Sequence, residues 1–347
     1  ILSNLEEVTP YFLFMNYANP MAICTWAMQK AFPHIQTVGL CHGVQHTTKM
    51  LCDWLGLPVT ECEALTAGIN HMAWFLRMEH QGRDLYPDLW KRLAEDGPIR
   101  GEDYRFEMMK ATGYFMTESS GHLSEYLPYF RHSRETQDLF SGPGFAGETA
   151  AYLKGCLKGY EDYKRQMTLW ADGKEPVPLD TETKSVEFAS DIMDARLTDR
   201  ICRFAGNTLN KGYITNLPPD CCVEVPIFVD RQGMHGSHVS ALPDQCAALC
   251  QSNIATQRLA VTAALEGDPE AVYHACLLDP LTAATLPPHK IRPMVEEMLK
   301  AQAAWLPQFK SLKSMTPGAD LVRRFGAIPS RERGSELKVR IGHYDKD

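Results

Sequence analysis

Residues 11–40 read YFLFMNYANPMAICTWAMQKAFPHIQTVGL, and this stretch decides the fold class of the chain. Tyr11 to Met15 is a short apolar and aromatic run that ends in a polar loop, which is typical of a buried parallel strand. The pattern from Met21 to Phe32 predicts a helix that Pro33 ends, and Thr37 to Leu40 predicts a second strand. Strand, helix and strand in this order predict a parallel βαβ unit of a doubly wound α/β sheet.

The rest of the chain alternates between helical and strand-like runs. Helical patterns cover residues 45–57, 85–113, 148–170 and 243–266, the last with Gly267 as its predicted C-terminal cap. AGINHMAWFLRME at residues 67–79 is a strand-like run with a polar pair in its middle, and CCVEVPIFVD at residues 221–230 predicts a buried strand. GPGFAG at residues 142–147 matches the dinucleotide-binding template, but it follows a polar stretch instead of a strand, which predicts a plain glycine loop.

The composition is that of a globular protein with a hydrophobic core. The 347 residues are 44% hydrophobic and 22% charged, and the formal net charge is -8. This balance, without a cluster of lysine and arginine, argues against a nucleic-acid or anionic-membrane partner and favours a small neutral substrate. No long uninterrupted apolar run and no signal segment occurs, and the 11 cysteines show no recurring CxxC pair. We expect a cytoplasmic protein with reduced cysteines.

Cys41, His42 and His71 are the side chains that the pattern itself singles out for chemistry. Cys41 and His42 directly follow the second predicted strand, at the carboxyl end where open parallel sheets bind ligands. His71 lies within the apolar run of residues 67–79. A thiolate and an imidazole form a partial ligand set for a divalent transition metal. The alternative interpretation is a buried cysteine and a hydrogen-bonded core histidine.

Five motifs link the chain to a known family. They are NYANPMAICTWAM at residues 16–28, VGLCHGVQ at 38–45, AGINHMAWF at 67–75, YFMTESSGHLSEYLPYF at 114–130 and NLPPDCCVEVP at 216–226. In this order and approximate spacing they resemble glycoside hydrolase family 4, and most closely its α-galactosidases of the melibiose type.

The resemblance implies a glycosidase that acts on α-galactosides and depends on NAD and Mn2+. Family members are implied to oxidise the sugar at C3, remove the C2 proton, eliminate the C1 leaving group and reverse these steps with water, unlike two-carboxylate glycosidases. By this resemblance Cys41 and His71 are the manganese ligands. Asn19 and Asn70 are expected to bind sugar hydroxyls, and Asn16 and Asn19 to lie beside the NAD.

The same resemblance offers candidates for proton transfer. The segment ESSGHLSEY at residues 118–126 aligns with the family's general base, for which His122 is the first candidate and Tyr126 the second. An imidazole with an unperturbed pKa of about 6.5 suits this task near neutral pH. His42 stands where α-phosphoglucosidase relatives carry an aspartate acid, so it is the candidate acid or substrate contact, and it favours a non-phosphorylated galactoside.

The resemblance also implies the domain organisation. Residues 1–60 are expected to be the C-terminal part, or remnant, of a Rossmann-like NAD-binding domain. Residues 61–310 are expected to form an α+β, lactate-dehydrogenase-like domain for substrate, metal and oligomerisation, and residues 311–347 a basic tail. The family's glycine-rich NAD-binding turn has no counterpart here, so we expect an N-terminally truncated member that forms a homodimer or homotetramer. An α-glucosidase of the same family, a catalytically inactive fragment and a lactate- or malate-type dehydrogenase are the alternatives.

Overall fold

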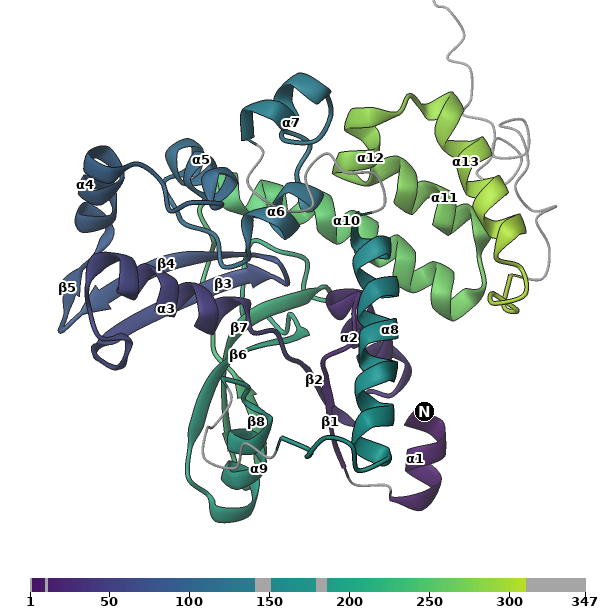
Figure 1. The fold of residues 1–347 in the computed structure, drawn as a ribbon, viewed down its shortest axis with the longest axis horizontal. Coiled ribbons are helices and arrows are strands. Elements are labelled where there is room, and N and C mark those ends of the chain that lie inside the picture. Colours follow the sequence, from purple (N-terminus) through teal and green to yellow (C-terminus); the bar gives the residue numbers. More distant parts are fainter. Residues whose placement is uncertain (1, 10–11, 141–150, 179–185, 310–347) are drawn as a thin grey trace, which may run out of the picture.

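The computed structural model describes residues 2–9, 12–140, 151–178 and 186–309, which form one mixed sheet with helices around it (Figure 1). The strands follow the order β1-β2-β6-β7-β3-β4-β5, with β8 paired to β7. They are β1 (Leu13–Asn16), β2 (Gln36–Gly39), β3 (Cys62–Ile69), β4 (Met72–His80), β5 (Arg83–Asp84), β6 (Cys202–Leu209), β7 (Cys222–Asp230) and β8 (Gly233–Gly236). Two predicted segments lie outside the described residues: the glycine-rich GPGFAG at 142–147 and the basic tail at 311–347.

The predicted βαβ unit is confirmed. β1 and β2 pair in parallel, and α2 (Met21–Ala31) connects them. β6 then joins β2 in antiparallel orientation through Gly39 and Asn207, and the pairs beyond it are antiparallel as well. The α/β class, with a Rossmann-like unit continued by an α+β part, is therefore confirmed. The sequence did not indicate β6, because Gly206 and Asn207 interrupt its apolar pattern.

Residues 67–79 form two strands instead of one strand-like run. β3 ends at Ile69, β4 begins at Met72, and the polar pair Asn70 and His71 forms the turn of an antiparallel hairpin. His71 has a left-handed backbone, with φ 63°, as a tight turn requires. A side chain on Gly68, whose φ is +155°, would lie 2.4 Å from the Met72 carbonyl oxygen. The sequence does not mark the reversal, because the residues on either side of the turn, 66–69 and 72–75, are all buried and hydrophobic alternation is absent there.

Helices cover the sheet and extend beyond it. They are α1 (Leu2–Val8), α3 (Gly43–Leu55), α4 (Tyr86–Asp96), α5 (Asp103–Thr112), α6 (Ser120–Tyr126), α7 (Arg134–Phe140), α8 (Ala151–Ala171), α9 (Ala189–Thr198), α10 (Asp244–Glu266), α11 (Pro269–Leu278), α12 (Pro280–Thr285) and α13 (Pro288–Ala301), besides a 3-10 turn at Val59–Glu61. α10 packs on α2 and on α11. It confirms the helix predicted for residues 243–266, and Gly267 ends it with a left-handed backbone.

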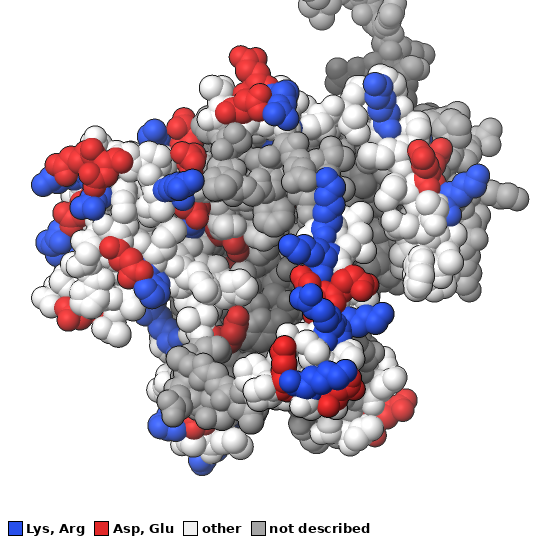
Figure 2. Space-filling model, in the orientation of Figure 1, with Lys and Arg blue, Asp and Glu red and all other residues white. Residues whose placement is uncertain are grey.

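The largest hydrophobic core joins β3, β4, β6 and β7 to α2 and α10. It fixes the end of β2 and the β3–β4 turn relative to each other, because both are attached to the same buried strands. Basic and acidic side chains are intermixed over the face in Figure 2, for example along α8 in the middle of the view. Among the described residues no helix is long and apolar enough to span a membrane.

Candidate functional site

Three separate segments meet at the carboxyl end of β2. The first is the short connection from β2 to α3, which carries Cys41 and His42. The second is the β3–β4 turn with His71. The third precedes α6 and carries Glu118; the backbone N–H of Thr117 donates to the Ala73 carbonyl at 3.0 Å, which fixes this segment beside the hairpin.

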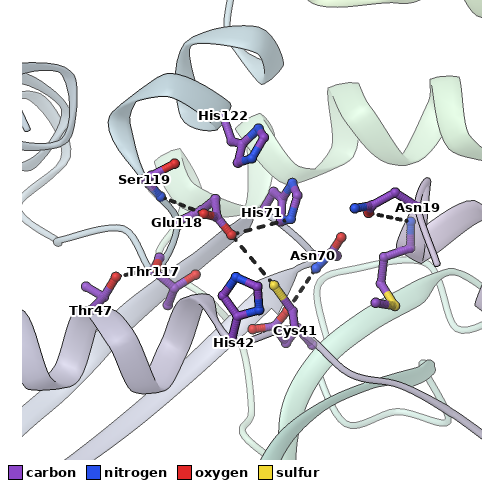
Figure 3. A network of polar contacts seen from close by, with 12 residues as sticks. Asn19, Cys41, His42, Thr47, Asn70, His71, Thr117, Glu118, Ser119 and His122 are labelled. Carbon is purple, nitrogen blue, oxygen red and sulfur yellow. Dashed lines mark hydrogen bonds and ion pairs between the residues drawn. The ribbon is translucent and has the colours of Figure 1, made fainter. Parts of the chain in front are cut away.

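The donor atoms of Cys41, His71 and Glu118 converge on one point, as Figure 3 shows. The Cys41 Sγ lies 3.6 Å from Glu118 Oε2, and the His71 Nε2 lies 3.4 Å from the same oxygen. One donor atom from each residue lies within 4.8 Å of the other two. A thiol, an imidazole and a carboxylate at this spacing form a donor set for a divalent cation.

Burial is the largest influence on the pKa values of Cys41, His71 and Glu118. It raises the pKa of the Cys41 thiol well above its usual range, and the charges of Glu224 and Glu118 add to that rise. It lowers the pKa of His71, against the opposing effect of Glu118. Burial also raises the pKa of Glu118, but the charge of His71, the Ser119 backbone N–H and the charges of His122 and Arg105 lower it, and the net shift is downward. Without a cation the thiol is therefore protonated, and a divalent cation favours the thiolate.

A second polar cluster lies beneath these donors, in the middle of the sheet. The buried carboxylate of Glu224, on β7, accepts hydrogen bonds from Asn207 Nδ2 at 3.1 Å and from Asn70 Nδ2 at 3.5 Å. Asn70 is 1% exposed and immediately precedes His71. The Asn70 amide also acts on the Cys41 thiol, whose pKa it lowers in part. Glu224 thus holds the amide that connects the two predicted metal ligands.

Both candidate bases lie against His71. The His122 ring stacks on the His71 ring with centroids 5.0 Å apart, and the Tyr126 ring meets it edge-on at 5.6 Å. The Nδ1 of His122 is 3.3 Å from Glu125 Oε2, and this hydrogen bond is the main cause that raises the pKa of His122. Burial raises the pKa of Tyr126.

The remaining predicted residues lie around this centre. His42 is exposed, and its Nδ1 lies 3.3 Å from Glu187 Oε1. Asn19 is exposed, and its Oδ1 accepts from the Met21 backbone N–H at 3.2 Å (Figure 3). Asn16 is buried at the end of β1, where its side-chain amide bonds to the backbone of Ala18.

Glu118 and Glu224 are functional candidates that were not predicted from the sequence. Each had a signal: Glu118 belongs to the TESS run of the fourth motif, and Glu224 is a lone charge in the apolar run CCVEVPIFVD. A buried carboxylate among apolar residues indicates a functional position, because its burial is costly unless partners are present.

Two models of known protein families match this chain. Residues 66–282 match the family described as the family 4 glycosyl hydrolase C-terminal domain, and residues 1–57 match family 4 glycosyl hydrolase. The chain belongs to glycosyl hydrolase family 4. The resemblance that the five motifs indicated is confirmed.

Several family 4 proteins are similar over most of this chain. A Rhizobium meliloti protein named alpha-galactosidase is 38% identical over 315 residues, covering 88% of this chain and 62% of that protein. A Bacillus subtilis alpha-galactosidase is 39% identical over 311 residues, covering 89% and 70%. An Erwinia rhapontici alpha-glucosidase is 27% identical over 336 residues, covering 89% and 71%. The chain thus spans about two thirds of the length of these curated relatives.

Solved structures share the fold of this family 4 chain. The Bacillus subtilis protein lplD aligns with a TM-score of 0.74 at 23% identity, over 86% of this chain and 71% of that one. A 6-phospho-alpha-glucosidase from gut microorganisms, in complex with NAD and Mn2+, aligns with a TM-score of 0.69 at 18% identity, over 87% and 69%.

Proposed function

We propose that this chain carries the catalytic centre of an α-galactosidase that depends on NAD and Mn2+. The observation behind the proposal is the convergence of Cys41, His71 and Glu118 at the end of β2, in a chain that is 38% and 39% identical to two alpha-galactosidases. The name alpha-glucosidase appears at the lower identity of 27%, which favours a galactoside as the substrate.

Cys41 and His71 are the manganese ligands in this proposal. The residues fit a cation, because a thiol and an imidazole face a carboxylate with all donor atoms within 4.8 Å. When bound, the ion supplies Lewis-acid polarisation of the sugar oxygens at C2 and C3, which acidifies the C2 proton. Asn70 is held by Glu224 between these ligands, so its orientation is fixed for a sugar hydroxyl.

His122 is the proposed base for the C2 proton. The Glu125 carboxylate accepts a hydrogen bond from Nδ1 and thereby directs the basic lone pair of the ring to Nε2. The stack of this ring on His71, a proposed metal ligand, supports the assignment. Tyr126 is the second candidate, but burial raises its pKa, so the phenol holds its proton more firmly.

His42 and Asn19 serve the outer part of the site. The Glu187 carboxylate contacts Nδ1 of the exposed His42 ring. A carboxylate beside an imidazole favours its protonated form, so His42 is the proposed proton donor to the leaving group. NAD supplies the oxidising equivalent at C3 when bound. The parallel strands β1 and β2 end at the proposed site, and Asn19, in the loop that Asn16 fixes, is the proposed contact to NAD.

The cellular setting follows from the same chemistry. Cys41 acts as a ligand only in its reduced form, and the described cysteines are all free thiols, so we place the protein in the reducing cytoplasm. The same proposal includes assembly as a homodimer or homotetramer. It also includes a domain boundary near residue 60, between the Rossmann-like part and the substrate domain.

The test is hydrolysis of p-nitrophenyl α-galactoside with NAD, Mn2+ and a reductant, beside assays that each lack one component. We expect activity only with all three, and a lower rate with p-nitrophenyl α-glucoside. Equal activity after chelation and removal of NAD would contradict the mechanism. If the chain binds manganese but does not hydrolyse the substrate, it is the catalytically inactive fragment and not an active enzyme.

A further inference from the structure

We infer that Glu118 is a third protein ligand of the divalent cation, and that it sets the preference of the site for a hard metal. This inference rests on the proposed function, which assigns Cys41 and His71 to the cation. The family resemblance did not imply Glu118, and its position among the donors comes from the structure.

The two distances from the Glu118 oxygen to the other donor atoms are those expected of ligands to one ion. Bonds of about 2.1 Å to nitrogen or oxygen and about 2.3 Å to sulfur place neighbouring donors roughly 3.0 to 3.6 Å apart, from octahedral to tetrahedral angles. The Oε2 of Glu118 lies 3.6 Å from Cys41 Sγ and 3.4 Å from His71 Nε2. Both distances fall within this range or at its limit.

The carboxylate is held so that one oxygen faces the other donors. The Ser119 backbone N–H donates to Oε1 at 2.8 Å, while Oε2 is the oxygen that faces Cys41 and His71. A side chain on Gly43 would place its Cβ 2.7 Å from Oε2, so any larger residue at the start of α3 would require this oxygen to move. The site is thus built around the position of one carboxylate oxygen.

The chemistry of the carboxylate explains what it adds. A thiolate and an imidazole alone are a soft and a borderline donor, and such a pair favours ions such as Cd2+ over Mn2+. A carboxylate oxygen is a hard donor that suits Mn2+. Its negative charge also neutralises the cation inside a site where Glu118 is only 9% exposed.

The test is the binding of Mn2+ and of Cd2+ to the full chain and to Glu118→Gln, counting only the binding that Cys41→Ser abolishes. Glutamine keeps the size of the side chain and the acceptor for Ser119. We expect Mn2+ affinity to fall at least about 30-fold and Cd2+ affinity less than about 5-fold. Glu107→Gln, on an exposed carboxylate of α5, is the matched control and should bind both ions as the parent does.

The outcomes separate this inference from the function on which it rests. If Glu118 only orients His71, both ions weaken by the same factor, and the inference is wrong. Unchanged Mn2+ affinity in Glu118→Gln, with binding still lost in Cys41→Ser, also overturns the inference but leaves the metal assignment intact. A parent chain that binds no Mn2+, or a Cys41→Ser chain that binds it normally, overturns both. Gly43→Ala provides a second route to the same answer, since it displaces Oε2 without changing any ligand.

Discussion

Glu224→Gln should change how the stability of the protein depends on pH. Glu224 is 3% exposed on β7. Burial raises its pKa from 4.5 to about 7, against the hydrogen bonds from Asn207 and Asn70, and the charge of Glu118 adds to the rise. The charge of Glu224 in turn raises the pKa values of the Cys41 and Cys222 thiols. Glutamine has the same shape and cannot ionise, so it isolates the contribution of this one proton.

The sign follows from proton binding. Between pH 4.5 and about 7 the folded state holds a proton on Glu224 that the unfolded chain has released, so the free energy of unfolding falls as the pH rises. A shift from 4.5 to about 7 corresponds to about 3 kcal/mol in full, of which about 2.5 kcal/mol falls between pH 5 and pH 8. The stabilisation is fully present below pH 4.5 and is lost as the pH passes the folded-state value.

The assay is urea unfolding with EDTA present, at pH 5 and at pH 8, on the parent and on Glu224→Gln. From pH 5 to pH 8 the free energy of unfolding of the parent should fall by about 2 to 3 kcal/mol more than that of the variant. Glu63→Gln, on an exposed carboxylate of β3, controls for the loss of a charge and should follow the parent. Parallel pH profiles for the parent and Glu224→Gln would refute the proposed protonation of this buried carboxylate.

Three further changes have defined outcomes. Cys41→Ser should abolish the rise in melting temperature that Mn2+ gives, while the far-UV spectrum stays that of the parent; an unchanged rise would contradict the site. Gly43→Ala should leave metal-free stability within about 1 kcal/mol, since alanine favours a helix, yet weaken Mn2+ binding about 10-fold in a titration, because Cβ would lie 2.7 Å from Glu118 Oε2. Arg292→Met should cost roughly 3 kcal/mol in urea unfolding, because it leaves the buried Glu270 carboxylate without its two bonds of 3.0 and 2.9 Å. Adding Glu270→Gln to Arg292→Met should recover part of that loss, and no recovery would point to packing instead of charge.

The local part of the fold was predictable from sequence. β1, α2 and β2 are consecutive, and their burial patterns and the stop at Pro33 depend on neighbours within a few residues. The place of Cys41 at the end of β2 followed from the same local pattern. The resemblance of the five motifs then favoured a metal site at Cys41 and His71, whereas periodicity alone left open a metal ligand or a core cysteine.

The three-dimensional part of the site was not predictable in this way. Glu118 lies 77 positions from Cys41 and reaches it only because the segment before α6 pairs with β4 through Trp74 and Met116. Asn70 and His71 were predicted to lie within one strand-like run, because the strand residues on either side of the turn are all buried and no alternating pattern marks the turn. Long-range pairing therefore decided which side chains meet.

Removal of the C2 proton of the sugar separates the proposed reaction from ordinary hydrolysis by two carboxylates. The most direct measurement is hydrolysis of p-nitrophenyl α-galactoside in D2O with NAD, Mn2+ and reductant, followed by NMR of the galactose formed. We expect deuterium at C2 of the product, because a base that removes this proton returns one from solvent. Galactose incubated in D2O with NAD, Mn2+ and reductant but without the protein should stay unlabelled. Product galactose that retains protium at C2 would contradict the mechanism.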